Sequence, residues 1–369
     1  MKTLSIDRNK RLREEPHTGH NRWHPDIDPI ITVDPGEPLT LETRDASDNQ
    51  IHPAMTVEEL PFIDGKVSHP LTGPVHINGA RPGDLLEVEF MDIRPHHCGW
   101  SLFRPTTGLL REYFPHFYLV HWTLADGWAT SPDLPGVRIP EGSMMGISGV
   151  APSHDQLREW TRREQELLDK GGNVMPPTPE DAVALKDHVR REGLRTIPPR
   201  ENGGNMDIKH LTKGARLFLP VNVEGALFST GDAHFYQGDS ECCLTAIEMQ
   251  ATVTVRFHLH PGKAAREKII WPRFSHPGYF NAPQWAVPQD FIATMGLPIH
   301  PMGIQGDEDH ITLAAKNAIL NMIDLLEHRG FTRDQAYIIC SVAADLKISS
   351  VVNLPNVLVS ALLPERIFI

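Results

Sequence analysis

The sequence predicts an α+β protein that is predominantly β, with sandwich- or barrel-like sheets and a few helices. The chain contains 32 prolines and 28 glycines, which is many for a helical protein. They recur as tight turns between runs of β-branched residues, the pattern of short strands joined by turns. Helical periodicity is confined to a few segments, including a pair near the C-terminus. With 369 residues, of which 40% are hydrophobic, the chain can form a substantial core.

The first part of the chain is predicted to form strands. Residues 30–44, IITVDPGEPLTLETR, read as strand, turn and strand, with Asp-Pro-Gly as the turn. Residues 73–93 repeat this pattern: VHI is a strand, NGARPGD the turn, and LLEVEFMDI a long alternating strand. Repeated Pro-Gly turns between such runs are typical of sandwiches and barrels.

The middle of the chain changes period and then returns to strands. Residues 153–170 have apolar residues at helical spacing behind Ser153, a candidate N-cap. A short helix is expected at 179–192, within a proline-rich surface excursion. Residues 214–257 are strand-like again, and residues 262–305 are expected to form loops with short strands.

The C-terminal part carries the strongest helical pattern, at residues 309–328, with a second capped helix after Thr332. The last stretch, KISSVVNLPNVLVSALLP, reads as strand, turn and strand. No internal repeat or linker interrupts the chain, so we expect one integrated unit over 1–369. A subdivision into an N-terminal β part, 1–150, and a motif-bearing part with helices, 151–369, is the alternative.

Composition narrows the function. The formal net charge of -12 argues against a nucleic-acid surface, and no apolar run is long enough to span a membrane. The charged N-terminus, MKTLSIDRNKRLREEP, lacks the apolar centre of a secretory signal. The four cysteines show no disulfide spacing and no CxxC, which favours reduced thiols in a cytoplasmic protein. They are Cys98, Cys242, Cys243 and Cys340.

One stretch concentrates ionisable groups: FSTGDAHFYQGDSECC, residues 228–243. In a strand, side chains at i and i+2 share a face, so Asp232 should point the same way as His234, and Asp239 the same way as Glu241. Across the short FYQG return the two pairs could converge. Their carboxylates and imidazole form a mixed O/N ligand set for a divalent metal. The alternative, about equally weighted, is a polar turn that faces water.

A second segment, PPRENGGNMDIKHL, supplies potential partners for this stretch. Gly203 and Gly204 allow the backbone to turn sharply and approach a ligand. Asn205 follows them, and Asp207 and Lys209 would share a strand face. The alternative is an ordinary loop with a local ion pair.

Two further segments are rich in histidine. In SHPLTGPVHING, Pro70 and Pro74 stiffen the segment and fix the orientation of His69, although a structural histidine is the more frequent outcome. GHNRWHPDI, residues 19–27, is the fourth cluster, and a role in a subunit contact is equally compatible with it.

Taken in order, these segments resemble the acetamidase/formamidase family of amide hydrolases. The matching segments are GHNRWHPDI, HPLTGPVHINGARPGD, GVAPSHDQLREW, PPRENGGNMDIKHL, FLPVNVEGALFSTGDAHFYQGDSE and VVNLPNVLVSALLP. GGNMDI together with VEGALFSxGDxHxxQGDxE is quite specific to this family. The resemblance runs from about residue 18 to the C-terminus and is closer to the formamidase branch.

The resemblance implies hydrolysis of the carbon–nitrogen bond of a small linear amide, such as formamide or acetamide. It also implies a β-rich fold, homo-oligomers (dimers or higher) and a metal near the acidic motifs. Ser240 stands where the family usually has glycine, and the segment 94–110 is shorter than in typical formamidases, which leaves the substrate open. The positions that match the motifs are Asp232, His234, Asp239, Glu241, Asp207 and His69.

The expected mechanism uses water activated by a divalent metal, with zinc expected and Ca, Mn or Mg as alternatives. The candidate ligands are Asp232, His234 and Asp207, with His69 as a further one. Glu241 or Asp239 would be the base, and Lys209 is a further catalytic candidate. The backbone of Gly203 and Gly204, with Asn205, would contact substrate and oxyanion.

Two rival hypotheses remain open. One is a metal-independent amidase that uses Cys243 as nucleophile with Glu201 and Lys209. The other is a non-catalytic metal-binding β protein. The aromatic residues Phe235, Tyr236, Trp271, Phe280 and Trp285 could line a larger pocket, although aromatic residues in loops more often simply pack.

Overall fold

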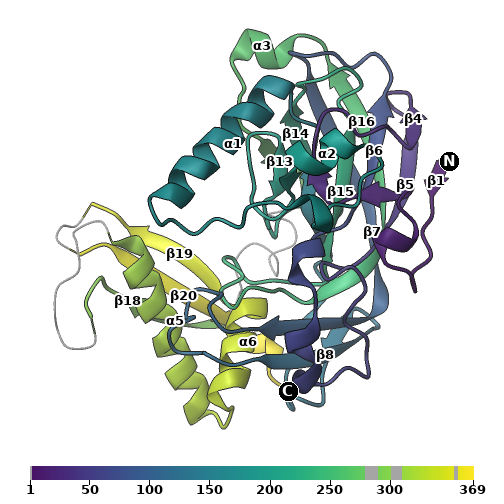
Figure 1. Ribbon diagram of the computed structural model, residues 1–369. Coiled ribbons are helices and arrows are strands. Elements are labelled where there is room, and N and C mark those ends of the chain that lie inside the picture. The colour runs from purple at the N-terminus through teal and green to yellow at the C-terminus, as the bar shows by residue number, and fades with distance from the viewer. Residues whose placement is uncertain (1, 279–289, 301–309, 353–355) are drawn as a thin grey trace.

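The computed structural model describes the whole chain except residues 1, 279–289, 301–309 and 353–355 (Figure 1). Most strands of the described residues join one 15-stranded sheet. Its main path runs in the order β10 (Arg138–Pro140), β9 (Trp128–Thr130), β8 (Tyr118–Ala125), β7 (Leu85–Phe103), β16 (Glu248–His260), β15 (Phe228–His234), β11 (Met144–Gly149) and β13 (Gly203–Asn205). Seven strands branch from this path: β1 (Lys2–Leu4), β2 (Gly19–His20), β4 (Ile31–Val33), β5 (Pro38–Thr43), β6 (Leu71–Ile77), β14 (Arg216–Pro220) and β17 (Arg273–Ser275).

The centre of the sheet is the antiparallel pair β7 and β16, which stay in register along most of their length. β16 also pairs with β5 and β15. Alternate side chains of β16, such as Val253, Val255 and Phe257, are fully buried in the main hydrophobic core. Burial of such apolar side chains is the main stabilising term of the fold. The predicted fold class, α+β and predominantly β, is confirmed.

Helix α1 (His154–Asp169) forms where the sequence predicts it. The Ser153 side chain accepts a hydrogen bond from the Gln156 amide, and Gln156 returns one to the Ser153 amide, as in a capping box. The predicted helix at 179–192 is instead two short pieces, η4 (Pro179–Asp181) and α2 (Asp187–Glu192). The other short helical segments are η1 (Leu12–Glu14), η2 (Val57–Phe62), η3 (Gly65–Val67), α3 (Lys263–Glu267) and η6 (Glu365–Ile367).

The C-terminal part forms a lobe that projects from the main body (Figure 1). It contains the antiparallel sheet β18 (Phe291–Gly296), β20 (Leu358–Pro364) and β19 (Asp345–Ser350). The predicted helical pair is confirmed as α5 (Ile311–His328) and α6 (Arg333–Ala343), and α5 packs on β18 and β20. Thr332 caps α6 as predicted.

A small two-stranded sheet pairs β3 (Arg22–Trp23) with β12 (Leu194–Arg195). The large sheet combines strands from both sides of residue 150, since β7 pairs with β16 and β11 with β15. Among the helices of the described residues, none is long and apolar enough to cross a membrane.

Candidate active site

The candidate site is built around the end of β15, where Asp232 and His234 lie on one face as the period-two spacing predicts. The His234 Nε2 is 3.5 Å from the Asp232 Oδ1, and both side chains are buried. Asp232 has φ of 56°, a left-handed conformation that is uncommon outside glycine. Backbone strain of this kind tends to gather at functional sites.

The ring of His234 is held by a second residue of the motif. Gln237 donates from its Nε2 to the Asp207 carbonyl oxygen, at 2.6 Å, so its Oε1 faces His234 as an acceptor. The His234 Nδ1 lies 2.8 Å from this Oε1 and therefore carries the proton of the bond. Nε2 therefore faces the acidic cluster. Burial disfavours the charged ring, but the charges of Glu248 and Asp232 raise the pKa of His234 well above its ordinary value. Loss of the Nε2 proton leaves the lone pair that a metal would bind.

Glu248, the first residue of β16, is a site residue that the sequence reasoning missed. Its Oε2 lies 3.2 Å from the His234 Nε2, and the side chain is buried. The available signal was an acidic residue in the apolar run LTAIEMQATVTV, where a buried charge requires a partner.

Asp207 and Glu241 complete the cluster from two loops. Asp207 lies close enough to Asp232 and His234 for the three to bind one ion. Glu241 comes from the loop after β15, with its Oε1 4.0 Å from the His234 Nε2. Both residues have left-handed backbones, with φ of 46° and 48°. Gly146 in β11 provides the space, because a Cβ there would be 2.5 Å from the Asp207 Oδ1.

Two predicted catalytic residues lie outside this cluster. The Asp239 Oδ2 accepts a hydrogen bond from the Lys347 Nζ at 2.8 Å, and the Lys209 ammonium pairs with the carboxylate of Asp345. The expectation that Asp239 shares a face with Glu241 was wrong, as was the same expectation for Lys209 and Asp207. The reason is that these residues lie in turns rather than strands, so the period of two does not apply.

The glycine pair lies beside the site rather than in it. Gly203 and Gly204 belong to β13, which pairs with β11, and the Gly203 N–H donates to the Arg200 carbonyl oxygen. Neither glycine lines the cavity at the cluster, whereas Asn205, the next residue, does. Among the predicted substrate-contacting residues, only Asn205 therefore faces the space a substrate would occupy.

The cavity over the cluster has a volume of about 150 Å³. His69 lies in its wall, with its backbone fixed by hydrogen bonds to and from the Thr196 hydroxyl. The other wall residues are largely apolar. The cavity is lined by Ala46, Ser47, Ile51, Ile63, Gly65, Ser68, His69, Trp100, Leu102, Arg104, Ile197, Asn205, Asp207, Asp232, Glu241, Leu244, Thr245 and Glu248.

Electrostatic coupling separates the pKa values of the cluster. Burial, with the nearby charge of Asp232, raises the pKa of Asp207 to about 6, and burial raises the pKa of Glu248 to about 7. Burial and the charge of Asp207 raise the pKa of Glu241 well above its ordinary range. Burial opposes ionisation of Asp232 as well, yet the neighbouring imidazoles of His69 and His234 lower its pKa to about 2. Divergent pKa values in one cluster are typical of acid–base sites.

Several buried polar atoms of the cluster have no hydrogen-bond partner among the described residues. Such atoms are rare in folded proteins and indicate an ion or ligand. They are the Asp207 Oδ1, Asp232 Oδ1, His234 Nε2, Glu248 Oε2, His69 Nδ1 and Asn205 Oδ1. Carboxylate oxygens and an imidazole nitrogen form the donor set of a zinc-type site, so these residues fit a divalent metal.

The structure does not assemble the cysteine alternative. Cys243 is fully buried, its Sγ contacts the Leu102 carbonyl oxygen at 3.4 Å, and burial raises the pKa of its thiol. Glu201 pairs instead with Arg163, and Lys209 with Asp345. None of these groups lines the cavity.

Other predicted residues lie away from the cavity. His20 and His24 of the N-terminal motif are buried, and the His20 Nε2 contacts the Ser229 hydroxyl at 2.8 Å. Phe235 and Tyr236 are buried and Trp271 is exposed, whereas Phe280 and Trp285 lie outside the described residues. The aromatic residue at the cavity is Trp100, which was not predicted.

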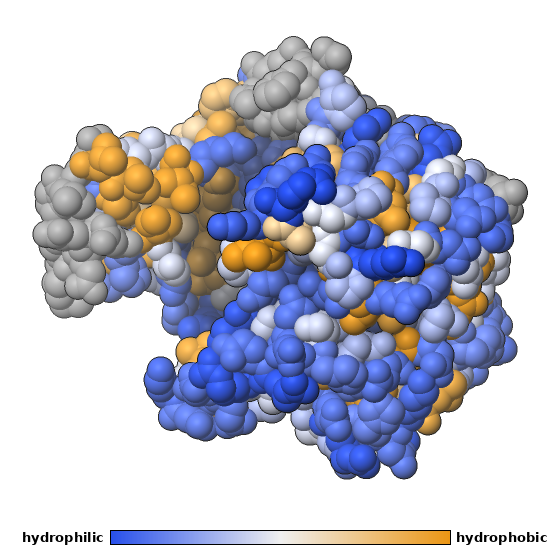
Figure 2. Space-filling model, turned by 90° about the horizontal axis from the view of Figure 1, so that it is seen from above, coloured by the Kyte–Doolittle hydropathy of each residue, from blue (hydrophilic) through white to orange (hydrophobic). Residues whose placement is uncertain are grey.

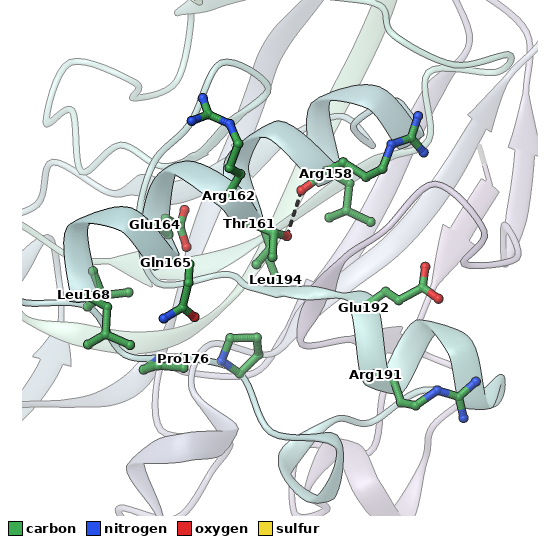
Figure 3. A pocket seen from close by; sticks show the side chains of 13 residues that line it. Arg158, Thr161, Arg162, Glu164, Gln165, Leu168, Pro176, Arg191, Glu192 and Leu194 are labelled. Atoms are coloured by element: carbon green, nitrogen blue, oxygen red, sulfur yellow. Dashed lines mark hydrogen bonds between the residues drawn. The ribbon is translucent and has the colours of Figure 1, made fainter.

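A second cavity, of about 650 Å³, lies between α1 and the segment that leads to α2 (Figure 3). Arg158 and Arg162 extend from α1, where they pair with neighbouring acidic residues of the same helix. Leu168, Pro176 and Leu194 form its apolar wall (Figure 3). Its charged side chains are mostly solvated, so the chemistry is better placed at the acidic cluster.

Comparison with known proteins identifies relatives of the whole chain. A family model for the acetamidase/formamidase family matches residues 5–369. An acetamidase of Mycolicibacterium smegmatis is 34% identical over 361 residues, covering 91% of this chain and 88% of that protein. A formamidase of Methylophilus methylotrophus is 32% identical over 388 residues, covering 100% and 94%. A solved structure, the gamma lactamase from Delftia acidovorans, superposes with a TM-score of 0.94 at 34% identity, covering 100% and 93%.

Proposed function

The chain belongs to the acetamidase/formamidase family, and from this premise we propose that it hydrolyses the carbon–nitrogen bond of a small amide. The products are a carboxylate and ammonia or an amine. The observation that carries the proposal is the buried group of acids and histidines whose unpartnered atoms face one small cavity. The names of the relatives, acetamidase and formamidase, supply the reaction class.

The proposal includes a divalent metal, with zinc first and Ca, Mn or Mg as alternatives. Asp207, Asp232 and His234 would hold it, since their ligand atoms lie within 4.8 Å of one another. His69 is a further candidate, because its Nδ1 is buried without a partner. Gln237 supports the assignment by fixing the His234 ring with Nε2 directed at the cluster.

A bound divalent cation would polarise the amide carbonyl and make a water molecule easier to deprotonate. Glu241 lines the cavity and has a raised pKa, so its carboxyl group can take the proton from the attacking water and pass it to the leaving nitrogen. The Glu248 Oε2 lies 3.2 Å from the His234 Nε2 and adds a carboxylate to the same group. The side-chain amide of Asn205 is positioned in the cavity wall to donate to the developing oxyanion.

A cyclic amide is the second candidate substrate. The gamma lactamase from Delftia acidovorans shares both the fold and 34% of the sequence with this chain. A γ-lactam has six non-hydrogen atoms, and a cavity of about 150 Å³ is large enough for a benzene-sized ligand. Linear amides and γ-lactams place the same bond in the cavity and need the same proton transfers.

The experiment is a hydrolysis screen with formamide, acetamide and 2-pyrrolidinone, using wild type and Glu241→Gln. Wild type should release product from at least one compound, and the variant should lose turnover by about 100-fold or more, as expected for an acid–base residue. An unchanged rate in the variant would remove Glu241 from the mechanism. A protein that hydrolyses none of these amides but loses thermal stability in the variant would support the binding-only alternative.

We also propose that the protein is cytoplasmic and forms homo-oligomers. All four cysteines are unbonded, which suits a reducing compartment.

In the C-terminal lobe, Thr294 faces α5 through its hydrogen bond to the Ala318 carbonyl oxygen. Phe291 and Met295 alternate with it, so they point away from the helix, and both are exposed. Figure 2 shows apolar side chains gathered on this lobe, the kind of patch that a second subunit covers. Light scattering on the purified protein tests the oligomer.

A further inference from the structure

One basic side chain faces the same cavity as the acidic cluster. Arg104 directly follows β7, and Trp100, Leu102 and Arg104 are spaced by two residues, so they fall on one face of the strand and its continuation. All three line the cavity. The part of the cavity wall formed by this segment is thus apolar at Trp100 and Leu102 and ends in the Arg104 guanidinium group.

The Arg104 guanidinium has no protein partner. No hydrogen bond, ion pair or ring contact joins it to any residue in the described part of the chain. Its pKa is lowered by burial, which removes the guanidinium group from water. The backbone makes room for it at Gly65, where a Cβ would be 2.8 Å from the Arg104 Nη1.

Three of the four fully buried arginines pair with carboxylates, and the fourth, Arg22, donates to the carbonyl oxygens of Asn21 and Thr178. Arg44, Arg195 and Arg200 each contact a carboxylate, at 2.7, 3.2 and 2.6 Å. Pairing is expected because a charge removed from water needs compensation. The half-buried Arg104 has neither kind of partner among the described residues, and it lines a cavity where a ligand can approach it, which points to an anionic group on the ligand.

The cavity volume limits the size of that ligand. About 150 Å³ matches a molecule with six to eight non-hydrogen atoms, by comparison with a cavity of that volume that binds benzene. Formamide and acetamide have only three and four. An acyl chain that runs from the cluster past Leu102 to Arg104 would use the remaining space.

We propose that Arg104 binds a carboxylate on the acyl part of the substrate, so that the preferred substrates are short monoamides of dicarboxylic acids. This rests on the proposed amide hydrolysis. Water adds to the amide carbonyl carbon, the carbon–nitrogen bond breaks, and the nitrogen leaves with a proton from the water. A dicarboxylate and ammonia result. The planar guanidinium matches a carboxylate with two parallel hydrogen bonds.

A pair of nearly isosteric amides tests this. Succinamate carries a terminal carboxylate, and 4-oxopentanamide replaces one of its oxygens with a methyl group. For wild type we expect kcat/KM to be about 10- to 100-fold higher for succinamate, the range for a charge-assisted hydrogen bond. Arg104→Gln should abolish this ratio, and Arg104→Lys should retain part of it as a point charge.

Arg111→Gln is the matched control, since Arg111 is an exposed arginine of the same loop outside the cavity, and it should keep the wild-type ratio. Equal kcat/KM for the two amides in wild type, or an unchanged ratio in Arg104→Gln, would overturn the assignment of Arg104.

If neither amide nor acetamide is hydrolysed, the proposed function fails instead. Calorimetric binding of succinamate to wild type and Arg104→Gln then still decides the role of Arg104: tighter binding to wild type supports it, and equal or absent binding overturns it.

Discussion

Three acidic residues of the site share an unusual backbone conformation. Asp207, Asp232 and Glu241 have φ values of 46°, 56° and 48°. Each such residue costs on the order of 1 kcal/mol or more relative to an extended or helical one. All three residues with this unfavourable conformation line the same cavity. The strain is consistent with carboxylates held in place for function rather than for stability.

Gly146 tests how closely these carboxylates must be placed. In Gly146→Ala, the new Cβ would meet the Asp207 Oδ1 at 2.5 Å and the Asp232 Oδ2 at 2.9 Å, so one carboxylate has to move. A displacement of about 1 Å at a reacting centre can cost on the order of 100-fold in rate. We expect a loss of kcat of that size in an ammonia-release assay, with the zinc content reduced. Gly278→Ala, whose Cβ would meet no described residue closer than 3.9 Å, is the control and should behave as wild type.

Metal affinity should depend on pH in a defined direction. Burial, together with the charge of Asp232, raises the pKa of Asp207 to about 6 in the metal-free protein, and a carboxyl group must lose its proton to bind metal. Affinity is therefore nearly constant above pH 7 and falls below pH 6, by about tenfold per unit for one released proton. Zinc titrations between pH 5 and pH 8 measure this. Asp126→Asn, a change in an exposed turn, should leave the profile intact, and a flat wild-type profile down to pH 5 would exclude Asp207 as a ligand.

Residue types and motif spacing predicted part of the site. Asp232, His234, Asp207, Glu241, Asn205 and His69 all reach the cavity or its cluster. The period-two argument succeeded for Asp232 and His234 because both lie in β15, and it failed for Asp239 because the chain turns there. Glu248 and Gly146 come close to the cluster only through strand pairing, which no local pattern encodes.

At the scale of elements, two ion pairs fasten the motif loops to the C-terminal lobe. Lys209 pairs with Asp345 at the start of β19, and Asp239 pairs with Lys347 in the same strand. The Asp345 Oδ1 also accepts the Asp239 N–H at 3.0 Å. The loops that carry Asp207 and Glu241 are therefore positioned from outside the cavity.

Lys209→Met tests this positioning role. Removing one partner leaves the carboxylate of Asp345 buried, so the free energy of unfolding should fall by about 3–5 kcal/mol, measured by denaturant titration. The double variant Lys209→Met/Asp345→Leu should recover part of the loss because no unpaired charge remains. If Lys209→Met instead kept full stability and lost turnover, Lys209 would belong to the chemistry.

Strands and helices were predicted with differing success. The α1 and α6 helices follow the capping residues that the sequence shows, Ser153 and Thr332. The expected helix at 179–192 breaks into two pieces, because a short segment has too few hydrogen bonds to sustain a helix without packing. The long continuation of β7 to Phe103, which carries Trp100 and Leu102 to the cavity, was not predicted. Pro95 interrupts the sequence pattern there, and pairing with β16 and β8 maintains the strand.

In the whole molecule, the candidate site is assembled from segments far apart in sequence. His69 precedes β6, Asp207 follows β13, and Glu248 begins β16. These elements meet in one sheet, so the site exists only when the sheet is complete. The residue types of the site and their motif partners were accessible from the sequence, whereas its depth, its volume and Arg104 required the fold.

The most direct test is amide turnover by one protein sample before and after removal of its metal. The protein is dialysed against a strong chelator, its metal content is determined, and turnover is measured before and after zinc is added back. Turnover should fall in proportion to the lost metal and return with zinc if Asp207, Asp232 and His234, whose ligand atoms lie within 4.8 Å of one another, hold the proposed divalent cation. Full turnover by protein shown to be metal-free would contradict this account.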